Sequence, residues 1–159
     1  MQPVAPRLEW SASAFFGAAA VALGILALIG IVPMTLSAVA IIVLGLAALI
    51  PQAALGEAPP VGVWGFRALV GVAAVALGVL ALIGIVPLTL TAVGVIVLGV
   101  DDFVPAGRPA AAAGRVEWGF RTFVGAAAVA LGILALIGVI PETLVAIAII
   151  VLGIGDIVP

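Results

Sequence analysis

Hydrophobic positions in this chain form long unbroken stretches, interrupted by prolines and short polar segments rather than by regular alternation. One stretch, VALGILALIGIVP at Val21–Pro33, returns as VALGVLALIGIVP at Val75–Pro87 and as VALGILALIGVIP at Val129–Pro141, 54 residues later each time. A fixed period of this length indicates tandem copies of one supersecondary unit. We therefore predict a single domain that is built by internal repetition.

The repeat units are defined by three tryptophans that fall at equivalent positions. The units are 10–51, 64–105 and 118–159, and the linkers between them are 52–63 and 106–117. Because the linkers are rich in Pro, Ala and Gly, we expect irregular surface segments there. The whole chain, 1–159, is then one transmembrane domain.

Each unit contains two apolar stretches separated by a proline. In the first unit they cover residues 12–32 and 34–50, which would span roughly 30 Å and 25 Å as helices, close to the hydrocarbon core of a bilayer. Both stretches are far longer than a strand. We predict an all-α membrane protein with six transmembrane helices in three tandem antiparallel hairpins. One kinked helix per unit would be too long to cross once.

The corner of each predicted hairpin contains proline and threonine. Proline fits the first turn of a helix and disfavours helix at the residue before it, and a nearby hydroxyl can bond to free backbone groups. Gly30 and its equivalents would ease the end of the first helix. The predicted corner residues are Pro33, Thr35, Pro87, Thr89, Pro141 and Thr143.

Small residues recur seven positions apart along the predicted helices. A heptad step keeps one face toward a partner helix, and close packing of small residues drives helix association in lipid. A groove that holds lipid or quinone is the alternative. We expect Gly24→Leu to disrupt its hairpin by overpacking this seam. The predicted packing residues are Gly17, Gly24, Ala38, Gly45, Gly71, Gly78, Ala92, Gly99, Gly125, Gly132, Ala146 and Gly153.

Composition agrees with a membrane environment and excludes several kinds of chemistry. The chain is 67% hydrophobic and 8% charged, which gives too few polar side chains to cover the surface of a soluble protein. The alternative is a soluble protein that hides its apolar surface in a large oligomer. It has no Cys and no His, so thiolate and imidazole metal sites and the usual general base are absent. With a net charge of −2 we expect no nucleic-acid partner. We predict no enzyme activity and no cofactor.

Two groups of side chains are expected at the linker side of the membrane. Trp10, Trp64 and Trp118 fit interfacial anchors. The charged residues Arg67 and Arg121 align with Ser13, and Asp102 and Asp156 align with Ala48, so the second and third units share charges that the first lacks. We expect these charges to pair, within a hairpin or as Arg121 with Asp102, or else to extend separately to water.

The unit resembles the repeat of the HdeD-like family of bacterial acid-resistance membrane proteins. The residues that carry the resemblance are Pro33, Thr35, Leu36 and Gly45, with their copies in the other units. The resemblance implies a multi-hairpin membrane fold and a role in acid stress. This chain departs from the family in its shorter length, in the high identity of its repeats, and in having neither His nor Lys.

Location and function follow from these expectations. Because all five Arg lie on the linker side, the positive-inside rule predicts cytoplasmic termini and linkers in a bacterial inner membrane. The expected role is structural or in membrane stress, through packing against lipids and other copies or subunits. An accessory subunit of a respiratory or photosynthetic complex holding lipid or quinone, and a passive channel or small transporter, are the alternatives. The sequence leaves a compact bundle and a flat row of hairpins equally open.

Overall fold

A computed structural model of the chain describes residues 12–49, 61–103 and 117–157, and these form six α-helices with no strand among the described residues. The prediction of an all-α protein is confirmed. The helices are α1 (Ala12–Leu28), α2 (Pro33–Leu49), α3 (Val61–Leu82), α4 (Pro87–Phe103), α5 (Glu117–Ile137) and α6 (Pro141–Ile157).

The helices that follow the linkers begin earlier than the sequence predicted. Helix α3 begins at Val61 and α5 at Glu117, so residues 61–63 and 117 are helical. Proline is tolerated just before and in the first turn of a helix, and Pro60 immediately precedes the apolar residues that start α3. The other linker residues, 52–60 and 106–116, lie outside the described part of the chain.

Two of the described helices contain an apolar segment of 18 residues, long enough to cross a membrane. These segments are Gly65–Leu82 in α3 and Phe120–Ile137 in α5, each with a mean hydropathy of 2.1. Within α1 and α2, the segments Ala14–Leu28 and Pro33–Leu49 are apolar but shorter. The described part of the chain is therefore helical, and two of its helices are long and apolar enough to cross a membrane.

The three corners share one backbone conformation. Gly30, Gly84 and Gly138 have φ of +87°, +90° and +91°, the left-handed region that glycine enters without steric cost. At the first corner the N–H of Gly30 donates to the carbonyl of Ala27, and the N–H of Ile31 donates to that of Leu26. This is the Schellman arrangement, which satisfies the last carbonyls of α1. The glycine therefore ends the first helix of each hairpin, as expected.

The residue before each corner proline is also left-handed, although it is β-branched. Val32, Val86 and Ile140 have φ of 45°, 42° and 42°. The following proline begins the next helix in all three hairpins, in agreement with the sequence prediction. The N–H of Leu36 then donates to the carbonyl of Val32, which starts the hydrogen-bond ladder of α2. These three residues carry backbone strain, because a branched Cβ is disfavoured in this region.

The expected hydrogen-bonding role of the corner threonines is met by a different residue. Thr35, Thr89 and Thr143 lie in the first turn of α2, α4 and α6, and their side chains are exposed. The hydroxyl that bonds back to the start of a helix in the described structure is that of Thr91, which donates to the carbonyls of Pro87 (2.9 Å) and Leu88 (3.0 Å). Thr91 is buried and lies one turn further along, where water does not compete.

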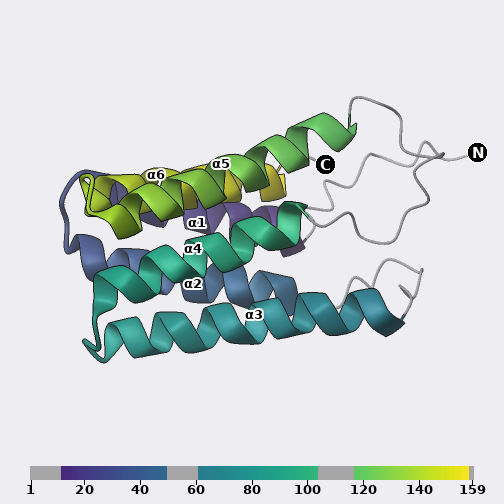
Figure 1. The fold of residues 1–159 in the computed structure, drawn as a ribbon, viewed down its shortest axis with the longest axis horizontal. Helices are drawn as coiled ribbons and strands as arrows, with labels where there is room; N and C mark the ends of the chain where they lie inside the picture. Colours follow the sequence, from purple (N-terminus) through teal and green to yellow (C-terminus); the bar gives the residue numbers. More distant parts are fainter. Residues whose placement is uncertain (1–11, 50–60, 104–116, 158–159) are drawn as a thin grey trace, which may run out of the picture.

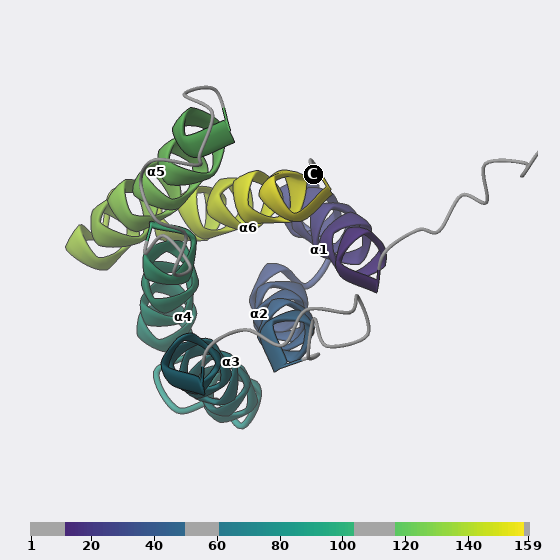
Figure 2. The same cartoon turned by 90° about the vertical axis from the view of Figure 1, so that its right-hand side faces the viewer.

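The helices form a closed bundle rather than a flat row. All six run along one long axis, with the corners at one end and the linkers at the other (Figure 1). Viewed down that axis, α2, α4 and α6 lie innermost, and α1, α3 and α5 lie outside them (Figure 2). The most extensive contacts join neighbouring hairpins, α2 with α3, α4 with α5, and α6 with α1. The last contact closes the ring.

The largest buried side chains of the core come from equivalent positions of the three inner helices, and smaller buried residues of the outer helices pack against them. Ile41, Val95 and Ile149 are fully buried, one from each inner helix. The next layer toward the linkers contains Leu44, Leu98 and Leu152, with exposed fractions of at most 7%. Because these positions are 54 residues apart and share a helix face, they form two apolar layers in the middle of the bundle.

The glycine seams join different hairpins, which corrects the expectation that they hold each hairpin together. A Cβ added at Gly17 would lie 2.7 Å from the carbonyl oxygen of Gly153, so α1 and α6 touch backbone to backbone. A Cβ added at Gly24 of α1 would lie 2.7 Å from Cγ1 of Ile150 in α6. The physical reason is that two glycines face each other only across hairpins, and lipid-embedded backbones approach most closely where both side chains are absent.

The other two seams repeat these contacts. A Cβ at Gly45 would lie 2.9 Å from the carbonyl oxygen of Gly71, and one at Gly99 would lie 2.9 Å from that of Gly125. The alanines of the predicted set contribute carbonyl oxygens to the same seams, at 3.2 Å, 2.9 Å and 3.1 Å from Cβ positions on Gly24, Gly78 and Gly132. These alanines are Ala146, Ala38 and Ala92, in that order.

Candidate functional site: the charged end of the bundle

Five charged residues gather at the linker end of the second and third hairpins. Arg67 lies near the start of α3 and Arg121 near the start of α5, while the carboxylates come from the last turns of α4 and α6. The two helices of each hairpin are antiparallel, so the start of the first and the end of the second meet at this end (Figure 1). The carboxylates are those of Asp101, Asp102 and Asp156.

The ion pair of this end joins Arg67 to Asp101. The Nε of Arg67 donates to Oδ2 of Asp101 at 3.2 Å, and the exposed fractions of the two side chains are 29% and 11%. The sequence prediction of pairing within a hairpin is therefore right for Arg67, but the expected partner, Asp102, is wrong. Successive residues of a helix point about 100° apart, and in α4 it is Asp101 that faces α3.

Asp102, the next residue of α4, is half-buried and forms no ion pair with Arg67. It lies close enough to Asp156 and Arg121 for their charges to interact with its own, and Asp156 in turn interacts with Arg121. Both carboxylates are half-buried, whereas the Arg121 side chain is exposed. Arg121 thus attracts a carboxylate of its own hairpin and one of the preceding hairpin, while Asp156 repels Asp102. Both pairings that the sequence left open for Arg121 are electrostatic contacts rather than hydrogen-bonded pairs.

Asp156 also lies at the seam that closes the ring. Its Cβ would be 2.9 Å from a Cβ placed on Gly17, so it packs directly against α1. Helices α1 and α2 contain no charged residue. Within the described helices, the charges of this end therefore all belong to the second and third hairpins.

The sequence missed Asp101 because the comparison of repeats directed attention to charges that occur twice. Asp101 aligns with Ala47 and Gly155, so it has no charged equivalent. The available signal was the angular position on the helix: Asp101 lies on the face of α4 that packs on α3, and Asp102 is turned about 100° away from it. A helical-wheel comparison of both aspartates with Arg67 would have identified it.

The chemistry available at this end is electrostatic. Two guanidinium groups face three carboxylates, and charges that are partly shielded from water interact more strongly than exposed ones. Among the described residues no group of three or more His, Cys, Asp or Glu side chains is arranged to hold a metal ion. The arrangement can orient hairpins and can hold water or counter-ions at its surface.

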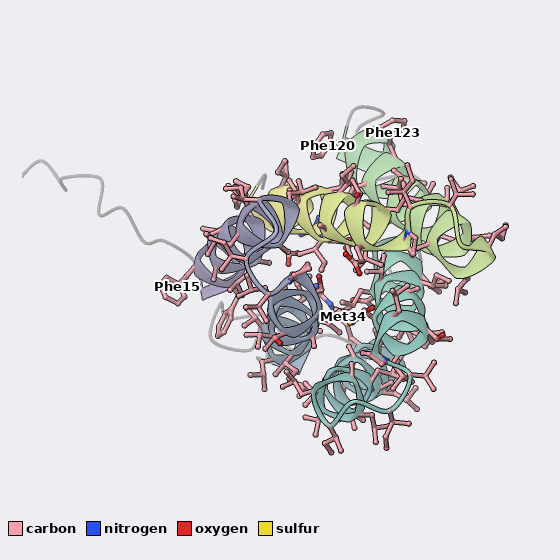
Figure 3. The ribbon with its side chains drawn as sticks, turned by 90° about the vertical axis from the view of Figure 1, so that its left-hand side faces the viewer. Phe15, Met34, Phe120 and Phe123 are labelled. Atoms are coloured by element: carbon pink, nitrogen blue, oxygen red, sulfur yellow. The ribbon has the colours of Figure 1, made fainter. Side chains whose placement is uncertain are left out.

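The corner end has a shallow pocket where the three inner helices converge. It is lined by Pro33, Met34 and Ser37 of α2, Leu88 and Thr91 of α4, and Glu142 and Val145 of α6. Met34 lies near the middle of this end, whereas Phe15, Phe120 and Phe123 point outward from the bundle (Figure 3).

The predicted tryptophan anchors are only partly placed by the structure. Trp64 and Trp118 lie in the first turns of α3 and α5, at the linker end, as an interfacial position requires. Trp10 lies outside the described residues. The interfacial role of the three side chains stays a prediction.

Comparison with known proteins gives no further guidance. No protein-family model matches the sequence, and no curated protein and no solved structure matches the chain.

Proposed function

We propose that the chain is an integral membrane protein that crosses the bilayer six times and acts through helix packing rather than through catalysis. The observation that carries this proposal is a girdle of exposed apolar side chains around the whole bundle. Thirty large hydrophobic residues of the described chain are exposed. Soluble monomers rarely expose contiguous apolar surface beyond a few hundred Å².

The girdle is the same on all three outer helices. Phe15, Leu69 and Phe123 occupy equivalent positions and are 64%, 66% and 71% exposed. Further along, Ile29, Ile83 and Ile137 are 68%, 68% and 71% exposed. A protein partner would cover one side of the molecule, whereas lipid covers every side. The even distribution therefore supports a bilayer as the surroundings of this bundle.

Helix lengths are compatible with six crossings. The shortest helices have 17 residues, which is about 25 Å and lies at the lower end of the range for a spanning helix. The apolar corner residues that follow α1, α3 and α5 lengthen the hydrophobic part of each hairpin. Only 28% of the apolar segments in α3 and α5 is buried, unlike the core helix of a soluble protein.

The proposed orientation places the corners outside a bacterial inner membrane and the linkers and termini in the cytoplasm. The reason is the Arg distribution, with Arg67 and Arg121 at the linker end and no Arg or Lys in the corners. Membrane lipids are the proposed partners, together with further copies of the chain or subunits of a larger complex.

The proposed role is structural or in membrane stress, and the resemblance to the HdeD-like family stays a prediction. The test compares cells that express the wild-type chain with cells that express Gly78→Leu, which overpacks the α2–α3 seam. We expect the wild type to remain in the membrane after alkaline carbonate extraction and to improve survival after acid exposure, and the variant to do so less. Extraction of the wild-type chain by carbonate would refute the membrane assignment. Equal survival with and without the chain would refute the stress role.

A further inference from the structure

We propose that the bundle fits a bilayer whose hydrocarbon core is thinner than average, so that phospholipids with short acyl chains are the preferred neighbours of its apolar girdle. This inference rests on the proposed membrane assignment and deepens it, because it names the class of lipid that the girdle contacts. Polar groups at the two ends of the bundle carry the inference, since they fix how far apart its two water-facing surfaces can lie.

The polar groups of the linker end include charges that lie on lipid-facing helices. Arg67 and Arg121 come after the first turn of α3 and α5, and not in the linkers before them. Arg67 is held at this level by its ion pair with Asp101, and the side chain of Arg121 is exposed. Because ionised side chains are strongly disfavoured in hydrocarbon, the headgroups of this leaflet must come close to the level of the two arginines.

The corner end must also reach polar surroundings, although most of its side chains are apolar. The helices α2, α4 and α6 begin at the corners, and the first N–H groups of a helix have no partner within it. Backbone polar groups without a partner are strongly disfavoured in hydrocarbon. The side chains of Thr35, Thr89, Thr143 and Glu142 are exposed at the same end. The headgroups of the second leaflet must therefore meet the corners.

The distance between these two levels is short. The helical rise from Arg67 to the corner glycine Gly84 is about 25 Å, and the equivalent residues of the third hairpin have the same spacing. On α6 the rise from Glu142 to Asp156 is about 21 Å. Any tilt of the bundle shortens both spans. Since a typical hydrocarbon core is about 30 Å thick, the apolar part of the second and third hairpins is too short by about 5 Å or more.

The lipid is the partner that adapts to this mismatch. The glycine seams bring backbone against backbone, as between Gly45 and Gly71, and the corner glycines fix where the helices end, so the bundle cannot lengthen. A bilayer thins around a protein that is too short, at a cost that rises with each Å of mismatch, and short acyl chains remove that cost. Extension of the arginine side chains toward more distant headgroups is the competing response, and it would leave no preference for chain length.

Fluorescence quenching tests this preference, because the native chain has no cysteine and a single label can be placed on the girdle. Val72 is 57% exposed on α3, between the levels of Arg67 and Gly84. The full-length Val72→Cys variant, labelled with a fluorophore, is reconstituted into vesicles with equal amounts of monounsaturated phosphatidylcholines whose chains have about 14 and about 20 carbons. In two matched preparations, either the short or the long chains carry bromine atoms, which quench only a fluorophore in contact with them.

We expect the brominated short-chain lipid to quench the label more strongly, with an about two- to fivefold preference over the long-chain lipid. Adding Arg67→Leu with Asp101→Leu removes the ion pair and extends the apolar surface, so the preference should fall to about half or less. Equal quenching by the two lipids, or stronger quenching by the long-chain lipid, would overturn the proposal. So would an unchanged preference in the variant that lacks the ion pair. Quenching by neither lipid would instead refute the membrane assignment.

Discussion

Gly45 in α2 and Gly71 in α3 approach each other so closely that a Cβ on either would lie within 2.9 Å of the other's carbonyl oxygen. This contact joins two hairpins, and it recurs at the other two seams of the ring. Gly71→Ala should therefore lower the free energy of unfolding by about 1–3 kcal/mol, because the added methyl meets backbone that cannot rotate away. Unfolding by SDS in mixed micelles measures the change.

Gly65 on the same helix provides the matched control. A Cβ at Gly65 would have no neighbour within 4 Å. Gly65→Ala should leave stability unchanged or raise it by up to about 1 kcal/mol through helix propensity. If both alanine variants behave alike, the seam does not depend on the missing side chains.

A second prediction concerns the corners. Gly84 has φ of +90° and nothing near it, so Gly84→Ala has room but the wrong backbone conformation. We expect a loss of about 1 kcal/mol. The strained neighbour Val86 should respond in the opposite direction, because Val86→Asn relieves the left-handed conformation and should gain a few tenths to about 1 kcal/mol. Thermal melts in detergent measure both, and stabilisation by Gly84→Ala would contradict the observed corner.

A third prediction distinguishes the partner of Arg67. A double-mutant cycle of Arg67→Gln with Asp101→Asn should give a coupling energy of up to about 1 kcal/mol, since the pair is hydrogen-bonded and partly shielded. The same cycle with Asp102→Asn should give a clearly smaller value. The charge exchange Arg67→Asp with Asp101→Arg should restore part of the loss. Larger coupling to Asp102 would show that the two aspartates exchange roles in the membrane.

A fourth prediction concerns the inner layers. Leu98 is 7% exposed between the inner helices, so Leu98→Ala should cost about 2–5 kcal/mol through the cavity that it leaves. Leu80 is 39% exposed on the outside of α3, and Leu80→Ala should cost less than about 1 kcal/mol. Similar losses at the two positions would mean that the inner helices do not form the core.

Sequence periodicity predicted the helical class, the corners and the small residues that pack, because each depends on local or repeated patterns. The glycine of each corner and the proline that follows it specify where one helix ends and the next begins. The choice of partner helix was not predictable in this way. The heptad of Gly17 and Gly24 shows that a face packs closely, but α2 and α6 are equally apolar candidates to receive it. Asp101 was missed for a related reason, since repeats emphasise what is shared and this residue occurs once.

The topology of the hairpins tests the central claim most directly. Single cysteines at Ile31, Ile85 and Val139, all exposed corner residues, and at Glu57 and Arg108 in the linkers can be labelled in intact cells with a membrane-impermeant thiol reagent. The six-span bundle predicts that all three corners react from outside, while both linkers react only after the membrane is opened. Reaction of a corner and a linker from the same side of an intact membrane would contradict it.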